Sequence, residues 1–425
     1  MSERSQSRRD FLQNIIIAVL TVSAVLLFTQ TQISNLGASS VFSRLFSGPE
    51  VQSSSITTAT QDPATPGAPM RVAVAGAYGR YGDVTMTTAD EAFLPLRQLL
   101  EQALGSVQTI SFSSSQAFRD AVNRPCVYYD FLKPLPLSIL ADLSQTTLSE
   151  DAVFARRLVL AEEGDTVALY LWAGTNRYYR SDTALSPEDL NAVVSRYELG
   201  NAFFAYESAE EDAQKLAFYS LLSDVEPQLP QLAVVSSLSD PSRLMAALGF
   251  NPNTQNRYWE SETTEVISEN NGRTLRLSTN GTVAYQNGND STLSIQAEGE
   301  RPSLVEAFTE VSRLLNELAV PSLGDAQLYL EQIQQLGAST TLRFGYQCGG
   351  VPIRFADGGS AAYVILSGTT VSSMELRLRQ YTATETDSLL LPLRQALAIA
   401  AEGAELSIGY ADNGGDTVSA AWLAD

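Results

Sequence analysis

Residues 263–285 read TTEVISENNGRTLRLSTNGTVAY and hold two short turns, at Asn271-Gly272 and Asn280-Gly281. Asn-Gly pairs favour the tight turns that join antiparallel strands, because both residues accept a positive φ. Apolar and polar residues alternate on either side of each turn, as in strands with one buried face. The segment therefore predicts a three-stranded meander, and with it an antiparallel-sheet fold for this part of the chain.

A helix is predicted after the meander, over residues 303–319, because apolar residues recur there at helical spacing. A helix with one apolar stripe covers one face of a sheet. Residues 323–425 repeat this order, with short alternating strands, a helix over 388–401 and two closing strands. We therefore expect a middle domain (236–322) and a C-terminal domain (323–425), each a meander plus a helix, alike in pattern rather than in residue identity.

Residues 70–235 are expected to form a first α+β domain that begins with a buried strand at 71–75. The glycine-rich stretch 76–82 follows this strand, but no helix opens directly after it and no acidic residue follows at the distance that a dinucleotide-binding turn requires. We interpret the stretch as a loop at the end of a strand. A helix is predicted over 207–222, near the end of this domain.

The segment 11–28 reads FLQNIIIAVLTVSAVLLF, and no charged residue occurs between Asp10 and Arg44. As a helix, it is roughly 27 Å long, close to the ~30 Å hydrocarbon core of a bilayer. A single helix can cross lipid because it satisfies its own backbone hydrogen bonds. We therefore predict a transmembrane anchor at 11–32.

A basic tail, residues 1–10, precedes this anchor, and its arginines favour a cytoplasmic N-terminus. Residues 33–69 are predicted to be a linker, because 47–69 are rich in Ser, Thr, Pro, Gly and Ala, which is typical of a flexible segment. The expected fold is thus α+β, with an N-terminal transmembrane helix followed by extracytoplasmic domains of antiparallel sheet plus helix. The expected location is the cell membrane, with a single pass and the bulk outside the cytoplasm.

Other interpretations of segment 11–28 stay open. A cleaved secretory signal also has a basic start and an apolar run, although its run is usually shorter, and Gly37-Ala38-Ser39 is a poor cleavage site. Residues 7–12, SRRDFL, match a twin-arginine export signal. A buried core helix is the remaining alternative, and it alone does not place the bulk outside the cytoplasm.

The composition excludes several classes of function. The chain carries 48 acidic and 27 basic residues, a net charge of −21, so we expect no nucleic-acid partner. It has no histidine, which removes Ser-His-Asp and Cys-His catalysis and histidine metal sites. One disulfide between its two cysteines, Cys126 and Cys348, is possible outside the cell, but they fall in different predicted domains and we expect two free or buried thiols. Carboxylate or lysine catalysis is not excluded by this composition. Because the sequence also has no nucleophile elbow and no metal-ligand cluster, we expect no enzyme activity, no cofactor and no metal site.

Two stretches resemble a known family. The first runs from Phe250-Asn251-Pro252 to the Asn280–Tyr285 strand and resembles the middle domain of YycH proteins. The second, residues 344–381 with the closing Ala421-Trp422, resembles the C-terminal domain that YycH shares with its relative YycI. The N-terminal anchor and linker are similar to those of the family too.

This resemblance implies a regulator without catalytic residues. YycH proteins are held by one N-terminal helix and fold outside the membrane. They associate with YycI and with the sensor histidine kinase of a two-component system that governs cell-wall metabolism. The resemblance therefore implies three partners for this chain, namely the membrane, a YycI-like protein and a sensor histidine kinase.

Contacts of the anchor helix with a partner helix are expected on one stripe of small and polar residues. Such residues let helices approach closely in lipid and form hydrogen bonds there. The candidate transmembrane helix-contact residues are Asn14, Ala18, Thr21, Ser23 and Ala24.

The alternative function is an envelope ligand-binding module, for a cell-wall fragment or another extracellular ligand, without kinase contact. Its candidate residues are the aromatic side chains Tyr178, Tyr179, Tyr258 and Trp259. Aromatic residues suit this role when they are exposed, and they otherwise pack in the core.

Overall fold

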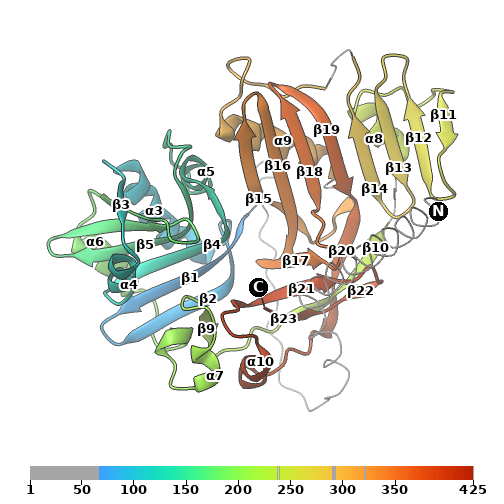
Figure 1. Ribbon diagram of the computed structural model, residues 1–425. Helices are drawn as coiled ribbons and strands as arrows, with labels where there is room; N and C mark the ends of the chain where they lie inside the picture. Colours follow the sequence, from blue (N-terminus) through green and yellow to red (C-terminus); the bar gives the residue numbers. More distant parts are fainter. Residues whose placement is uncertain (1–66, 237, 239, 290–292, 320–321, 425) are drawn as a thin grey trace, which may run out of the picture.

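The computed structural model describes residues 67–236, 238, 240–289, 293–319 and 322–424. Within these residues the chain forms two large β-sheets with helices packed on their faces (Figure 1). The architecture is mixed α+β with more strand than helix, in agreement with the predicted class. The first sheet and its helices form one body, and the second sheet with its helices forms the other.

The first sheet has seven antiparallel strands in the order β2-β1-β4-β5-β6-β7-β3. The strands are β1 (Pro69–Gly76), β2 (Gly79–Thr87), β3 (Ser111–Ser113), β4 (Cys126–Pro136), β5 (Phe154–Glu163), β6 (Thr166–Trp172) and β7 (Tyr178–Asp182). Successive side chains of a strand point to opposite faces. Val72 and Val74 therefore pack with α3 (Leu94–Gly105) and α6 (Pro187–Val194), whereas Ala73 packs with α4 (Ser115–Val122) on the other face.

The glycine-rich stretch 76–82 forms the hairpin between β1 and β2. Gly79 turns the chain with a φ of +112°, a conformation that favours glycine. The stretch is thus a turn between two strands, as the sequence indicates, and β2 rather than a helix follows it.

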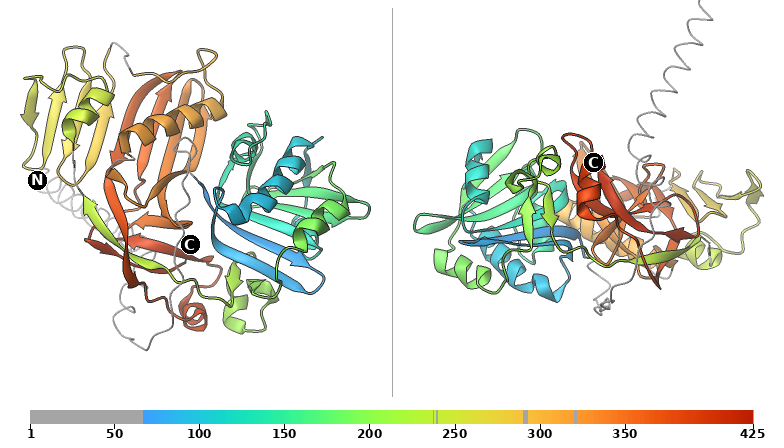
Figure 2. Two further views of the ribbon diagram at one scale, coloured as in Figure 1. Left: turned by 180° about the vertical axis from the view of Figure 1, so that it is seen from behind. Right: turned by 90° about the horizontal axis from the view of Figure 1, so that it is seen from below.

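The second sheet has eleven strands in the order β11-β12-β13-β14-β19-β18-β16-β17-β21-β23, with β15 paired to β16. The strands are β11 (Arg257–Trp259), β12 (Thr264–Ser268), β13 (Thr274–Ser278), β14 (Thr282–Gln286), β15 (Gln327–Leu336), β16 (Ser339–Cys348), β17 (Val351–Phe355), β18 (Ala362–Ser367), β19 (Thr370–Arg377), β21 (Leu406–Asp412) and β23 (Ala420–Ala424). Because β14 pairs with β19, residues 236–322 and 323–425 share one sheet instead of forming two. Helices α8 (Pro241–Ala247) and α9 (Leu304–Ala319) lie across one face of it (Figure 2).

The meander predicted over residues 263–285 is confirmed. Strands β12, β13 and β14 pair in sequence, and the turns between them contain Gly272 and Gly281 with φ values of +85° and +88°. The helix predicted over 303–319 is confirmed as α9, and its apolar stripe is buried against the sheet. The two Asn-Gly turns and the alternation around them therefore predict the strands that the structure shows.

Two other predicted helices differ from the structure. The helix predicted over 388–401 is shorter, since α10 spans Leu393–Ile399. The prediction over 207–222 is wrong. A four-residue helix, α7 (Glu211–Gln214), is followed by strand β9 (Leu221–Ser223), which pairs with β8 (Ala202–Phe204). Phe218 stacks on Tyr206 with ring centroids 4.0 Å apart, and this packing replaces the continued helix.

The two bodies touch through several elements. Strand β10 (Pro230–Ser236) follows the first body and pairs with β20 (Arg379–Asp387) and β22 (Thr417–Val418) beside the second sheet. Helix α5 (Leu137–Leu143) packs on α9, and both contribute to one apolar core. The turn after β16 lies so close to β2 that a Cβ atom at Gly350 would stand 1.6 Å from the carbonyl oxygen of Thr85. The bodies are thus in close contact.

Within the described ranges, no helix combines the length and apolar character needed to cross a membrane. The predicted basic tail, the transmembrane anchor at 11–32 and nearly all of the linker at 33–69 lie outside the residues that the structure describes.

Candidate functional site

Five charged side chains meet where the two bodies touch, four of them buried and Arg156 partly exposed, and we call them the junction cluster. Arg71, Asp130, Arg156 and Arg157 belong to β1, β4 and β5, whereas Glu405 immediately precedes β21 of the second sheet. Glu405 accepts hydrogen bonds from Arg71 at 2.8 Å and from Arg157 at 2.7 Å, and it also pairs with Arg156. Asp130 pairs with Arg156 at 2.8 Å and with Arg157 at 3.1 Å. One carboxylate of the second body is therefore held by three guanidinium groups of the first.

The register of the first sheet assembles this cluster. Arg71 lies opposite Asp130, Asp130 lies opposite Arg157, and Arg157 lies opposite Trp172. Directly opposed residues in a sheet share one face, so these four side chains form a row across β1, β4, β5 and β6. The guanidinium carbon of Arg157 lies 4.3 Å from the centre of the Trp172 ring, a cation–π contact. Pairing of four strands therefore places Arg71 and Arg157, two of the donors to Glu405, on one face of the sheet.

The carboxylates of the cluster stay ionised although they are buried. Burial opposes ionisation of Asp130, but Arg156, Arg157 and Arg71 outweigh it and hold its pKa well below the usual range. Burial also opposes ionisation of Glu405, and the arginines, Arg157 foremost, lower its pKa despite the nearby Asp130. The cluster thus carries three positive and two negative charges, and Glu405 supplies one of only two anions.

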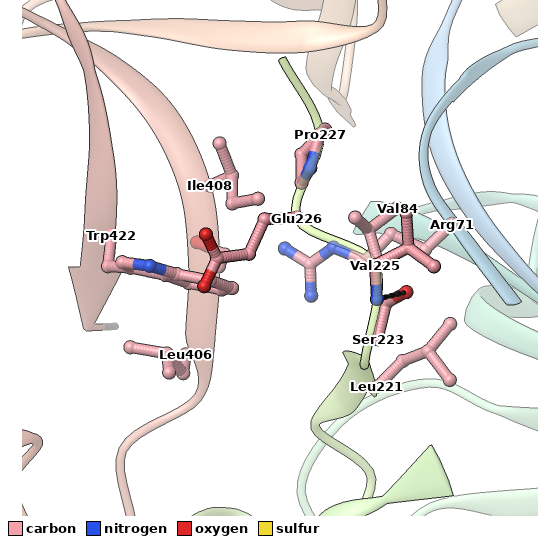
Figure 3. Close-up of a pocket in the computed structure, with 11 residues that line it drawn as sticks. Arg71, Val84, Leu221, Ser223, Val225, Glu226, Pro227, Leu406, Ile408 and Trp422 are labelled. Atoms are coloured by element: carbon pink, nitrogen blue, oxygen red, sulfur yellow. Dashed lines mark hydrogen bonds between the residues drawn. The ribbon is translucent and has the colours of Figure 1, made fainter. Parts of the chain in front are cut away.

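A small cavity of about 10 Å³ adjoins the cluster, enough space for one water molecule. Figure 3 shows the Arg71 side chain extending from the first body toward Glu226, with Ile408 and Trp422 of the second body on the far side. The cavity is too small to hold a substrate or cofactor. This part of the junction is therefore a packed contact, not an open binding pocket.

A bulge in β4 connects the junction cluster to the protein surface. The pairing of β4 with β5 shifts register between Asp130 and Leu135, and Leu132 within this segment has a φ of +65°. The backbone N–H of Leu132 donates a hydrogen bond of 2.9 Å to the buried carboxylate of Asp130. A bulge bends a strand and redirects its side chains. Here it places Lys133 and Pro134 on the wall of a surface groove.

This groove has a volume of about 470 Å³ and lies between the two bodies. The first body contributes residues from β4, from the start of β5 and from the turn before β7, and the second contributes residues from β15 and β16. We call it the junction groove, and its lining residues are Lys133, Pro134, Phe154, Arg177, Glu331, Gln332, Ile333, Gln334 and Arg343. Its size falls in the range of small-molecule sites, roughly 300–1,000 Å³.

The residues predicted from the sequence do not form this site. The transmembrane candidates Asn14, Ala18, Thr21, Ser23 and Ala24 lie outside the described residues. Tyr258 and Trp259 are 52% and 61% exposed on β11, the outermost strand of the second sheet (Figure 1). Tyr178 packs on Phe118 and Tyr179 stacks on Phe112, both in the first body. The structure therefore does not bring the two aromatic pairs together.

The junction cluster and the junction groove were not predicted. One signal in the sequence was the Arg156-Arg157 pair between apolar residues of one strand, because buried arginines need acidic partners. Glu405 gave no such signal, since its contacts to Arg71, Arg156 and Arg157 depend on how the two bodies dock.

Within the residues that the structure describes, no three Cys, Asp or Glu side chains are grouped so that they could hold a metal ion. Cys126 and Cys348 are both buried and free, as the sequence predicts. Burial raises the pKa of the Cys126 thiol to about 11 and that of Cys348 to about 12, so both thiols stay protonated at neutral pH. The sequence matches no protein-family model, no curated protein and no solved structure at a significant level.

Proposed function

We propose that this chain is a membrane-anchored accessory protein that regulates a sensor histidine kinase linked to cell-wall metabolism. It acts without catalysis, by protein–protein contact through its transmembrane helix and its extracytoplasmic domains. The resemblance to YycH proteins and the apolar segment at 11–28 support the proposal. The two stretches that carry the resemblance are neighbours in the second sheet, since β14 of the first pairs with β19 of the second.

The single observation that carries the proposal is the aromatic edge of the second sheet. Strand β11 ends the sheet, and its outer edge has no strand partner among the described residues. Tyr258 and Trp259 stand on it, more than half exposed. Unpaired edges can accept a strand from another protein, and aromatic side chains are enriched in protein interfaces. The edge also belongs to the stretch that resembles the middle domain of YycH proteins.

The test is a crosslinking pull-down of the full-length chain from membranes. Wild-type protein should retain the sensor kinase or the YycI-like protein, and the double variant Tyr258→Ala/Trp259→Ala should lose it. Tyr78→Ala is the matched control, because Tyr78 is 92% exposed at the turn of the first hairpin. Retention of the same partners by the double variant would show that β11 is not the contact surface.

The anchor is tested separately. Exchanging segment 11–28 for an unrelated apolar helix should abolish modulation of the kinase while the protein stays in the membrane. Asn14→Leu and Ser23→Ala should weaken modulation, because polar contacts between membrane helices contribute roughly 0.6 kcal/mol each. Unchanged kinase output after the exchange would assign the activity to the outer domains.

The second candidate function is an envelope ligand-binding module without kinase contact. The junction groove favours it, since its volume of about 470 Å³ suits a ligand of small-molecule size. Ligand binding by a full-length chain that retains no membrane partner in the pull-down would favour this function over the first.

A further inference from the structure

We propose that the junction groove binds a phosphorylated, hydroxyl-rich ligand of the sugar phosphate class. Lys133, Arg177 and Arg343 bind its phosphate groups. The inference does not depend on the regulatory function proposed above, because the groove and the β11 edge share no residue.

The charge of the groove differs from that of the rest of the chain. Three cations and one carboxylate, Glu331, line it, in a protein with a net charge of −21. Glu331 accepts a hydrogen bond of 3.0 Å from the hydroxyl of Tyr329. A local positive site of this kind attracts phosphate groups, and arginine binds them in a bidentate manner.

None of the three cations forms an ion pair within the described part of the chain, although acids outnumber bases. Arg180, close to Arg177 in sequence, shows the usual behaviour, since it pairs with Glu163 and Asp182 at 2.7 and 2.8 Å. Arg343 instead lies 5.6 Å from the centre of the Tyr363 ring, a contact that leaves its hydrogen-bond donors without a carboxylate. The groove therefore has three cations available for an external anion.

The other lining residues indicate the rest of the ligand. Gln332 lies directly opposite Arg343 in the β15–β16 pair, so the two side chains share one face. Gln334, two residues along the same strand, points to that face as well. Amide side chains donate to and accept from hydroxyl groups, and Phe154 offers an apolar surface for a carbon ring. The three cations, the two amides and the Phe154 ring of the groove together suit a sugar phosphate better than a simple inorganic anion.

The groove is built before any ligand arrives. The β4 bulge that presents Lys133 is fixed by the hydrogen bond from Leu132 to Asp130. Asp130 is itself held by Arg156 and Arg157 in the junction cluster. A preformed site binds more tightly because little ordering accompanies binding.

The test is isothermal titration calorimetry of the full-length chain in detergent micelles, with fructose 1,6-bisphosphate as the probe. Pyrophosphate tests charge alone, and a hexaglutamate peptide tests an acidic protein segment. We expect saturable binding of the sugar bisphosphate, tighter than that of either other probe. Arg343→Gln and Lys133→Met should each weaken it about tenfold, as loss of one charge-assisted hydrogen bond predicts.

Arg196→Gln is the matched control, since it removes one exposed positive charge on the first body outside the groove and should leave the affinity unchanged. Tryptophan fluorescence confirms that each variant is folded. The proposal is overturned if the sugar bisphosphate does not bind, or if Arg343→Gln binds it as the control does. It is also overturned if pyrophosphate or hexaglutamate binds as tightly as the sugar bisphosphate.

Discussion

Replacing Glu405 with glutamine should loosen the contact between the two bodies. The substitution keeps the shape of the side chain but leaves Asp130 as the only anion of the junction cluster beside its three arginines, of which Arg71 and Arg157 are buried. Breaking a buried ion pair by removing one partner costs about 3–5 kcal/mol, because the remaining charge stays buried and uncompensated. With a urea m-value of roughly 3 kcal/mol/M, the unfolding midpoint should fall by about 1–1.7 M urea.

Tryptophan fluorescence is a suitable assay because two of the three tryptophans lie at the junction. Trp172 lies under Arg157, and Trp422 lines the small cavity. Glu402→Gln is the matched control, since it removes the same charge three residues earlier at an exposed position. Equal urea midpoints for the Glu405 and Glu402 variants would refute the reasoning, because apolar packing alone would then hold the bodies together.

The junction cluster also predicts that stability depends on pH, which wild type and Glu405→Gln together test. The pKa values of Asp130 and Glu405 are lowered in the folded state, so their ionisation stabilises the fold above the pKa values of the unfolded chain, about 4. This stabilisation is lost as the pH falls below about 4, toward the lowered folded-state values. Between pH 7 and pH 3, the urea midpoint of wild type should fall toward that of Glu405→Gln. A constant difference between the two midpoints over this range would contradict the assignment.

Two further predictions concern close contacts and buried thiols. Gly350→Ala should destabilise the chain by roughly 1–3 kcal/mol more than Gly349→Ala. Both glycines have a positive φ, but only a Cβ atom at Gly350 meets the carbonyl oxygen of Thr85. Equal urea midpoints of the two variants would contradict this prediction. Burial raises the pKa of the Cys126 thiol to about 11 and that of Cys348 to about 12. Because the thiolate is the reactive form, both should react with a thiol reagent at pH 8 at least about a hundredfold faster in urea than in the native chain. Fast labelling of the native protein would contradict their burial.

The strands of the meander were predictable because local chemistry decides them. Asn271-Gly272 and Asn280-Gly281 specify the turns, and the alternation between them specifies which face is buried. The pairing of β14 with β19 was not predictable, since it joins residues about 90 positions apart and no local signal records a partner strand. The two predicted units therefore appear as one sheet. The helix expected over 207–222 failed for a similar reason, because aromatic packing overrode the local preference.

The junction could be predicted only in part. The sequence shows Arg156-Arg157 between apolar residues of one strand and thus indicates that acids must lie near, but it does not show which ones. The pairing register of β4 and β5 brings Asp130 to the arginines, and the docking of the two bodies brings Glu405 to them. The groove depends on the same docking, since Lys133 and Arg343 come from different bodies. Sites of this kind require the three-dimensional arrangement before any of their residues stands out.

The two proposed surfaces can be tested independently because they border the second sheet on different sides. Strand β11 is its last strand, whereas β15 borders the sheet beside the first body (Figure 1). Substitutions at distant sites without shared partners have additive effects. Tyr258→Ala/Trp259→Ala should therefore leave sugar phosphate binding unchanged, and Arg343→Gln should leave partner retention unchanged. Coupling between the β11 edge and the junction groove would require two arrangements of the bodies that differ in their affinity for the partner or the ligand. Glu405 joins the two bodies in the junction cluster, so its loss would shift the equilibrium between such arrangements.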